Sequence, residues 1–379
     1  MFLLQALGSN GSGQLGIGHK DDVSTPQPVI LPPTLTPSAQ ERPKQIVAGG
    51  NHTLLLLSSG NLYWSGDPTT GACGRLPANE NLDELTPEFR PVDLHPLPPG
   101  TKVRLAAATW EASVVVTTES ESTNGGITND KVFSFGAGAK GELGLGASTL
   151  QISEATEIPD FPPAGTQIVD LAASMSHVVA VLSNGEAWGW GGGRKGQLGE
   201  PATGVVHSPR RIEGPRLDFK VTKAVCGREF TCLFGSPETG EMVVLGSDKW
   251  GVQSRAPSNV APWKKVGAGW GSVFVLKEDG TLLRWGRDDH GQLAREDLGH
   301  VKDIAVGSEH ALALTENGDL VAWGWGEHGN CGPIRDSPGE RGQRNRITTN
   351  DALSSERGME ITMIGAGCAT SWIAFGRAT

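Results

Sequence analysis

The sequence has a single tyrosine, few cysteines, no excess of positive charge and no long apolar run. Five cysteines in 379 residues are an odd number and too few for a disulfide framework, which favours a reducing compartment. No apolar run approaches the roughly 20 residues of a membrane-spanning helix. The 32 basic residues are outnumbered by 42 acidic ones, and this net charge of −10 argues against a general nucleic-acid or anionic-membrane surface.

The first seven residues carry no basic segment and lead into a Gly/Ser turn, so they are too short for the apolar region of a signal peptide. We therefore expect a soluble protein of the cytoplasm, with access to the nucleus, and no membrane partner.

Glycine, by contrast, is abundant. The 53 glycines are about twice the usual share of about 7%. Each costs about 1 kcal/mol relative to Ala inside a helix, so a mostly helical protein is not expected. There is no Gly-X-Y period, which excludes collagen. The apolar share of 37% argues against disorder.

The glycines recur in a nine-residue frame such as GSNGSGQLG or GGGRKGQLG. Seven copies begin at Gly8, Gly66, Gly136, Gly191, Gly246, Gly286 and Gly324. A second signature, a turn of small residues followed by an apolar strand, alternates with the first. Its seven copies span 48–57, 107–116, 173–182, 226–234, 268–276, 306–314 and 366–375.

A tight turn joins each apolar strand to the strand before the next glycine frame. Asn184-Gly185, Asp279-Gly280 and Asn317-Gly318 occupy this place, and such pairs favour a type I′ hairpin turn with two residues at positive φ. Each unit then holds four short strands, which is typical of a β-propeller blade.

The two signatures together predict an all-β fold, a seven-bladed β-propeller that forms one domain over 1–379. The chain begins within a blade and ends one strand short of completing another, so we expect the N- and C-terminal strands to close one shared blade. Four insertions interrupt the period, at about 77–101, 118–131, 200–220 and 333–360.

The segments GSNGSGQLGIG (8–18) and WGRDDHGQLA (285–294) give the sequence a resemblance to the regulator of chromosome condensation family of seven-bladed propellers. The resemblance covers nearly the whole chain, although the frame at 246–254 ends in VQS instead of QLG. Within that family, the start MFLLQALGSNGSGQLGIGHKDDVSTPQ and the segment WGWGEHGNCG (323–332) are similar to the fungal alpha-tubulin suppressor or killer-toxin-insensitivity branch.

That resemblance implies a non-enzymatic adaptor that forms a heterodimer with a small zinc protein of diphthamide biosynthesis. The pair would support Elongator-dependent modification of wobble uridines in tRNA and diphthamide formation on translation elongation factor two. The resemblance implies no cofactor in this chain, and zinc only in the partner. It leaves open whether the propeller itself contacts tRNA.

Two other functions remain as alternatives. The founding branch of the family implies a guanine-nucleotide exchange factor for a small nuclear GTPase, with a basic tail, which is not seen here, and a protruding β-wedge, for which 118–131 is the candidate. A propeller lactonase or lyase would need acidic or His ligands around the central channel, where the repeat predicts small residues instead.

Few residues suggest catalysis. His52, His177 and His310 recur at one repeat position but in separate blades, so we interpret them as structural caps that bind turn backbone. Glu327-His328 with Cys331 resembles part of a zinc site, but a zinc site needs three or four converging ligands, and no second Cys/His cluster is near. The segment GGGRKGQLG (191–199) lacks the Lys-Ser/Thr end of a phosphate-binding loop.

Residues that break the repeat are better candidates. Trp110 and Trp270 stand in small-residue turns where other copies carry Asn, Ser or Arg, and exposed Trp is enriched at binding hot spots. Turns of one class emerge on one propeller face, so several unusual side chains can share a rim. The partner-binding candidates are Trp110, Arg228, Glu229, Trp270, Ser308, Glu309, Trp325, Glu327 and His328. The competing interpretation is that the rings cover only their own blades.

Overall fold

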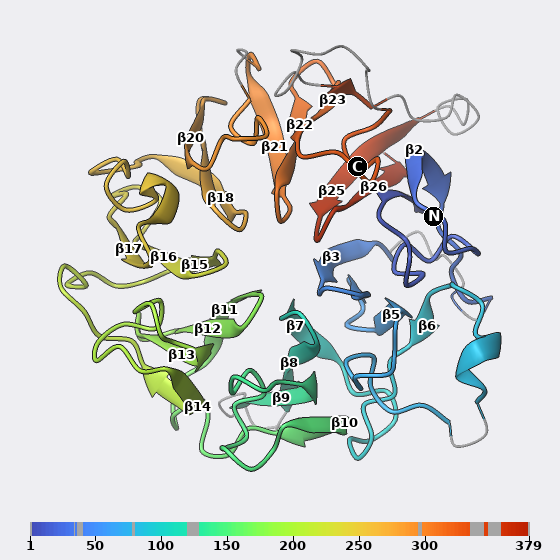
Figure 1. Ribbon diagram of the computed structural model, residues 1–379, viewed down its shortest axis with the longest axis horizontal. Coiled ribbons are helices and arrows are strands. Elements are labelled where there is room, and N and C mark those ends of the chain that lie inside the picture. The colour runs from blue at the N-terminus through green and yellow to red at the C-terminus, as the bar shows by residue number, and fades with distance from the viewer. Residues whose placement is uncertain are drawn as a thin grey trace.

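The computed structural model describes residues 2–33, 35, 41–77, 80–119, 129–294, 298–333, 345–347 and 358–377. Seven antiparallel sheets follow one another around a central channel (Figure 1). Within the described residues the only helical pieces are two 3₁₀ turns, η1 (Leu82–Glu84) and η2 (Lys249–Gly251). The predicted all-β, seven-bladed propeller is therefore confirmed.

We number the blades 1 to 7 in ring order, blade 1 being the one that holds both chain ends. The inner strands of blades 1 to 7 are β25 (Met359–Ala366), β3 (Pro43–Ala48), β7 (Val103–Ala108), β11 (Ile168–Ser174), β15 (Lys223–Cys226), β18 (Trp263–Ala268) and β21 (Val301–Val306). The second strands are β26 (Thr370–Arg377), β4 (His52–Leu57), β8 (Ala112–Glu119), β12 (His177–Leu182), β16 (Phe230–Phe234), β19 (Ser272–Lys277) and β22 (His310–Thr315).

The third strands, in the same order, are β1 (Leu3–Gly8), β5 (Leu62–Gly66), β9 (Asn129–Ala137), β13 (Ala187–Gly192), β17 (Met242–Gly246), β20 (Leu282–Gly286) and β23 (Leu320–Gly324). Five blades have an outer strand among the described residues: β2 (Val23–Pro28), β6 (Arg90–Pro91), β10 (Gln151–Glu157), β14 (Val205–Arg211) and β24 (Asn345–Arg346). In the described part of the chain, blades 5 and 6 have three strands each.

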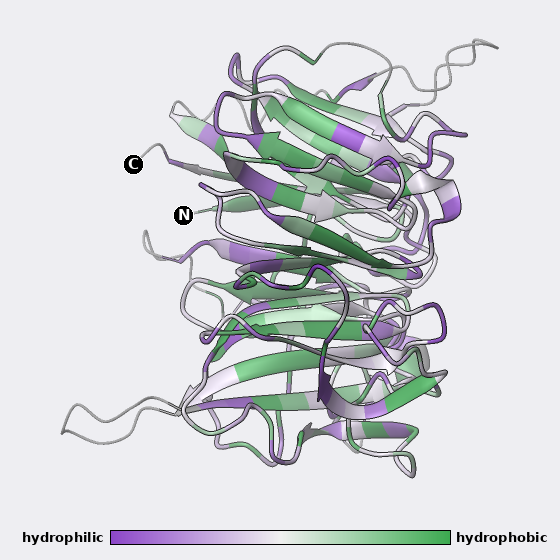
Figure 2. Cartoon of the chain, turned by 90° about the vertical axis from the view of Figure 1, so that its left-hand side faces the viewer, coloured by the Kyte–Doolittle hydropathy of each residue, from purple (hydrophilic) through white to green (hydrophobic). Residues whose placement is uncertain are grey.

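The two chain ends close blade 1. Strand β1 pairs antiparallel with β26 in register from Leu3 opposite Phe375 to Gly8 opposite Thr370. Both ends leave the molecule on the same side (Figure 2). The expected shared blade is confirmed, and it joins the first and last segments of the chain by backbone hydrogen bonds.

The core lies between blades. The second strands are apolar runs without alternation; Leu54 to Leu57 on β4, for example, are all fully buried. A strand is apolar throughout when both of its faces are covered, and here each face packs against a neighbouring blade. Apolar residues therefore follow the strands through the thickness of the ring (Figure 2).

The first glycine of every frame is the last or next-to-last residue of a third strand, with φ between 103° and 118°. A Cβ there would lie 2.3–2.5 Å from the carbonyl oxygen of the residue before the second strand, a distance that real Cβ atoms do not reach. The residue after this glycine donates its N–H to that same carbonyl in all seven blades. The frame glycine thus fastens the end of the third strand to the turn beside the channel.

The hairpin turns differ from the expected type I′ geometry. Gly185, Gly280 and Gly318 have positive φ, but the Asn or Asp before each does not. In each, the glycine N–H donates to the carbonyl three residues back, as Gly185 does to Leu182 at 2.8 Å. This is a type I turn followed by one left-handed residue, which needs glycine at a single position. Asn124-Gly125 lies outside the described residues.

The insertions contain more structure than their composition suggests. The first one (77–101) contributes β6 and η1, and its Phe89 is fully buried. The third one (200–220) contributes β14. Strands β8 and β9 continue their pairing as far as residues 119 and 129, and the tip of that second insertion lies outside the described residues, as does most of 333–360. In the described residues, no helix is long or apolar enough to cross a bilayer.

Candidate partner-binding face

The turns between inner and second strands all surround one end of the channel, and we call this side the turn face. These turns are residues 49–51, 109–111, 175–176, 227–229, 269–271, 307–309 and 367–369. The glycine frames are fastened to the same turns, so the second residue of each frame also lies there. We call the opposite side, which carries the type I hairpin turns, the hairpin face.

Backbone hydrogen bonds link these turns from blade to blade. Gly50 donates to the Trp110 carbonyl and Trp110 to that of Met175. Across the channel, Arg228 donates to Trp270, Trp270 to Ser308 and Ser308 to the Gly367 carbonyl, with N–O distances of 2.7–3.0 Å. These bonds join five of the seven neighbouring pairs of turns, and they fix the backbone that carries the side chains of the rim.

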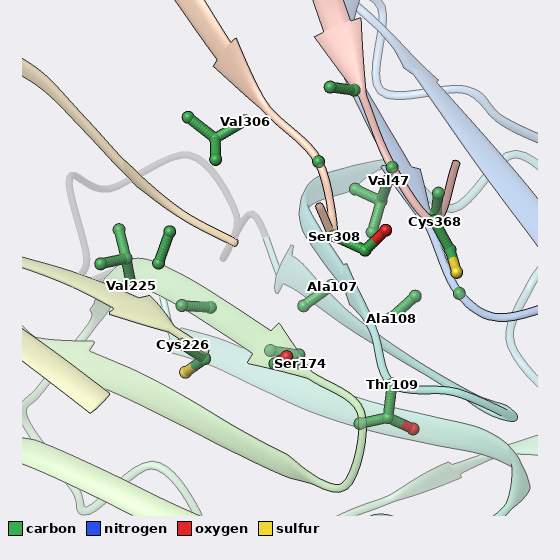
Figure 3. Close-up of a pocket in the computed structure, with 18 of the residues that line it drawn as sticks. Val47, Ala107, Ala108, Thr109, Ser174, Val225, Cys226, Val306, Ser308 and Cys368 are labelled. Carbon is green, nitrogen blue, oxygen red and sulfur yellow. The ribbon is translucent and has the colours of Figure 1, made fainter. Parts of the chain in front are cut away.

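The channel itself is narrow and lined by small side chains of the inner strands (Figure 3). It encloses about 290 Å³, and Ala107, Ala108, Ser174 and Cys226 project toward it. In the described residues, no three His, Cys, Asp or Glu side chains are grouped so that they could hold a metal ion.

Trp110 and Trp270 meet at the turn-face end of this channel, although they come from blades 3 and 6. Their ring centroids are 6.0 Å apart and their planes are tilted by 44°, within the usual range of attractive aromatic pairs. Trp110 also covers Gly50, where a Cβ would lie 2.5 Å from the indole ring. Both rings remain partly exposed, so they present an aromatic surface at the centre of the face.

A pocket of about 360 Å³ opens beside Trp270. Trp250, which is 38% exposed, forms another wall, and Glu229 and Ser247 line it as well. The Arg228 guanidinium carbon lies 5.6 Å from the Trp270 ring centroid, and the Lys249 Nζ lies 5.0 Å from that of Trp250. Each is within the distance of a cation–π contact.

Arg287 joins the pocket to the next blade. Its guanidinium donates two hydrogen bonds to Asp289, at 2.6 and 2.9 Å, and one to Glu309 at 2.5 Å. It also lies 5.0 Å from the Trp250 ring centroid and 5.8 Å from that of Trp325. The hydrogen bonds from Arg287 hold the pKa of the Asp289 carboxyl well below its usual range. Arg287 therefore fixes both rings and both carboxylates in one network.

Trp325 extends the aromatic surface over blade 6. Its ring stacks on His290 with centroids 3.9 Å apart and planes parallel within 1°. Glu309, the neighbouring member of the network, is buried and also accepts a hydrogen bond from the Gln292 amide at 2.9 Å. The face thus carries aromatic rings from blades 3, 5, 6 and 7.

The structure brings most of the predicted residues together. Trp110, Arg228, Glu229, Trp270, Ser308, Glu309 and Trp325 lie on the turns and frames around the channel end. Ser308 lines the channel, and its Oγ accepts from the Ala369 N–H. Glu327 and His328 share the face but not the pocket, since His328 Nδ1 is 2.8 Å from Asp22 Oδ2 of the loop after β1. Their partner-binding role stays a prediction.

The repeat histidines join neighbouring blades. The Nε2 atoms of His52, His177 and His310 lie 2.9–3.0 Å from the hydroxyls of Ser113, Thr231 and Ser371, each on the next blade. Burial lowers the pKa of all three to about 4, so they are neutral at pH 7. They are structural, as expected, and each lies within hydrogen-bond distance of a hydroxyl of the next blade.

Several residues around the pocket were not among the predicted binding residues, namely Lys249, Trp250, Arg287 and Asp289. The signal for Arg287 lies in the frame alignment. The second frame position is Ser9, Asp67, Ala137, Gly192 and Ser247 in blades 1 to 5 but Arg287 and Trp325 in blades 6 and 7. Trp250 is also unusual in holding a left-handed backbone, at φ 74°, with a bulky side chain. Bulky residues at the second frame position, which is small in the other blades, identify Arg287 and Trp325 as part of this site.

Comparison with known proteins covers nearly the whole chain. The model of the RCC1-like domain family matches residues 4–373. An RCC1 repeat-containing protein of Schizosaccharomyces pombe is 30% identical over 324 residues, which is 81% of this chain and 83% of that protein. The secretion-regulating guanine nucleotide exchange factor of Mus musculus is 28% identical over 316 residues, and the match spans 77% of this chain but 61% of the mouse protein.

Among solved structures, Prp20p of Saccharomyces cerevisiae superposes with a TM-score of 0.78 at 22% identity. The match covers all of this chain and 92% of Prp20p. At this identity the likeness concerns the fold alone.

Proposed function

The chain belongs to the RCC1-like family of seven-bladed propellers, and on that basis we propose that it is a non-enzymatic scaffold whose turn face binds a protein partner. The observation that carries the proposal is the pair Trp110 and Trp270, which meet at the centre of the hydrogen-bonded rim while staying partly exposed. Aromatic side chains held in place by the fold lose little conformational entropy on binding, which is why they dominate interfaces.

The surrounding contacts support an interface rather than an active site. Arg287, Asp289 and Glu309 bind one another, and the three repeat histidines bind hydroxyls of the next blade. These groups stabilise the ring and the rim. The exposed side chains around Trp270, chiefly Trp250, Arg228 and Lys249, are suited to recognition.

For the partner we propose a small zinc protein of diphthamide biosynthesis, bound as a heterodimer in the cytoplasm, with access to the nucleus. The pair would support Elongator-dependent tRNA wobble-uridine modification and diphthamide formation. Support comes from the resemblance of 1–27 and 323–332 to the fungal adaptor branch and from a fungal relative that matches over most of both chains.

Co-purification of the full-length chain with that zinc protein tests this function. We expect a complex of one copy of each protein that survives gel filtration, and tRNA with reduced wobble-uridine modification when the propeller is absent. Failure of the purified proteins to associate, with both folded and the partner loaded with zinc, would contradict the proposed partner.

A second candidate function is guanine-nucleotide exchange on a small GTPase. It is favoured by the similarity to the mouse relative, a guanine nucleotide exchange factor 28% identical to this chain. Release of a fluorescent guanine nucleotide from a small nuclear GTPase, followed with the propeller at substoichiometric concentration, decides between the two. Accelerated release would favour exchange activity, and an unchanged rate would favour the scaffold.

A further inference from the structure

Five exposed cations of the turn face lie on three consecutive blades, whereas Arg287 of blade 6 is paired with Asp289 and Glu309. The fourth and fifth positions of the glycine frame are Arg194 and Lys195 in blade 4 and Lys249 and Trp250 in blade 5. In blade 3 the fifth position is Lys140. The same positions in blades 6 and 7 are Asp289-His290 and Glu327-His328. Together with one turn residue of blade 5 the cations form a basic arc, defined as Lys140, Arg194, Lys195, Arg228 and Lys249.

All five side chains of the basic arc are exposed, and none forms a salt bridge with a described residue. The acidic residues in the glycine frames of blades 3 and 5 accept hydrogen bonds from the backbone of their own loops. Glu142 accepts the backbone N–H of Lys140, and Asp248 accepts those of Gln253 and Ser254. Glu111 and Glu229 are the acidic residues on the turns of these blades. The arc is therefore a local excess of unpaired cations on a protein whose net charge is −10.

We propose that the basic arc binds an acidic segment of the partner protein and that one carboxylate of this segment enters the pocket between Trp250 and Trp270. The inference rests on the proposed scaffold function and adds the chemistry of the partner. Arg228 and Lys249 both line that pocket and can donate to an incoming carboxylate, while Lys195, Arg194 and Lys140 continue the positive surface over blades 4 and 3.

An acidic peptide fits this surface better than a nucleic acid does. Stacking of bases needs free aromatic faces. Here Trp110 and Trp270 contact each other, His290 covers Trp325, and Arg287 lies over Trp250. The net charge of −10 would also repel the long run of phosphates outside the arc. A short acidic segment can contact the cations of the arc without lying over the negatively charged surface outside it.

Fluorescein-labelled hexaglutamate is a probe of this chemistry that does not involve the zinc protein. Its binding to the full-length chain is followed by fluorescence anisotropy between about 50 and 200 mM salt. We expect binding that weakens as salt rises and that falls by about tenfold in the double variant R228E/K249E. The matched control is K220E/K302E, which makes the same change in net charge.

The control residues lie toward the hairpin face. Lys220 packs against the hairpin glycine Gly185, and Lys302 follows Val301, whose N–H donates to the hairpin carbonyl of Gly280. We expect this variant to bind the probe within about twofold of the wild type. Equal weakening of hexaglutamate binding in both variants, or no binding to the wild type, would overturn the proposal. It would also be overturned if labelled oligouridylate bound the wild type more tightly than hexaglutamate does and lost this binding in R228E/K249E.

The two proposals fail separately. If the zinc protein does not associate but hexaglutamate binds at the arc, the partner is wrong and the acidic-segment inference stands. If the zinc protein binds equally to the wild type and to R228E/K249E, the scaffold function stands and the arc is not its docking surface.

Discussion

Trp250 combines an unfavourable backbone conformation with an exposed ring. Its φ of 74° lies in the left-handed region, which costs a non-glycine residue roughly 1–2 kcal/mol. Its ring lies within cation–π distance of Lys249 and Arg287 and forms a wall of the pocket. Strain of this kind collects at functional sites because binding, and not folding, selects the side chain.

Replacement of Trp250 by Gly and by Ala separates the backbone strain from the ring. Both variants lose the same ring, but only Gly adopts positive φ freely, so we expect W250G to have a free energy of unfolding about 1 kcal/mol higher than W250A. Urea denaturation of the two variants measures this difference in the free energy of unfolding. Both should bind hexaglutamate more weakly than the wild type does. Equal stability of the two variants would mean that the left-handed conformation is not retained.

At the scale of elements, neighbouring blades are joined by the same small set of contacts. A histidine that begins the second strand binds a hydroxyl on the next blade in three of the seven junctions described above. Trp190, Trp285 and Trp323 on third strands donate their indole N–H to the glycine frame of the preceding blade at 2.8–2.9 Å. These contacts explain why one strand residue of the repeat recurs as His and another as Trp.

The buried histidines give the fold an acid-sensitive stability. Their pKa of about 4 in the folded protein lies below the ordinary 6.5, so the unfolded chain binds more protons between these values. The free energy of unfolding should therefore decrease as pH falls from about 6.5 to about 4. We expect H310N, compared with the exposed-site control H19N, to reduce that slope by about 1.4 kcal/mol per pH unit in urea titrations. An unaltered slope would contradict a neutral, buried His310.

At the scale of the whole molecule, the ring depends on the pairing of its first and last segments. Deletion of residues 1–8 removes β1 and exposes the edge of β26. We expect the free energy of unfolding to fall by more than about 4 kcal/mol, beyond the range of ordinary substitutions. Deletion of residues 378 and 379, which follow β26, is the control. A melting transition unaffected by loss of residues 1–8 would show that ring closure does not hold the fold.

The repeat made the fold predictable, because seven frames and seven small-residue turns leave one architecture. The predicted type of the hairpin turns was wrong, because Asn-Gly pairs are compatible both with type I′ turns and with a type I turn followed by a left-handed glycine. The repeat also placed Trp110, Arg228 and Trp270 on one face. It could not place Arg287 among Trp250, Trp325 and Glu309, because those contacts join separate blades and arise from ring geometry. His328 turns toward Asp22 for the same reason.

Trp110 and Trp270 form the centre of the proposed partner-binding surface. Isothermal titration of the zinc protein into W110A/W270A measures the contribution of the two rings to affinity most directly. The matched control is W188A, which replaces a partly exposed Trp on β13. Removal of two hot-spot tryptophans usually costs 2 kcal/mol or more, so we expect affinity to fall by at least about thirtyfold while the melting transition stays cooperative. Unchanged affinity of the folded double variant, or an equal loss in W188A, would contradict the claim.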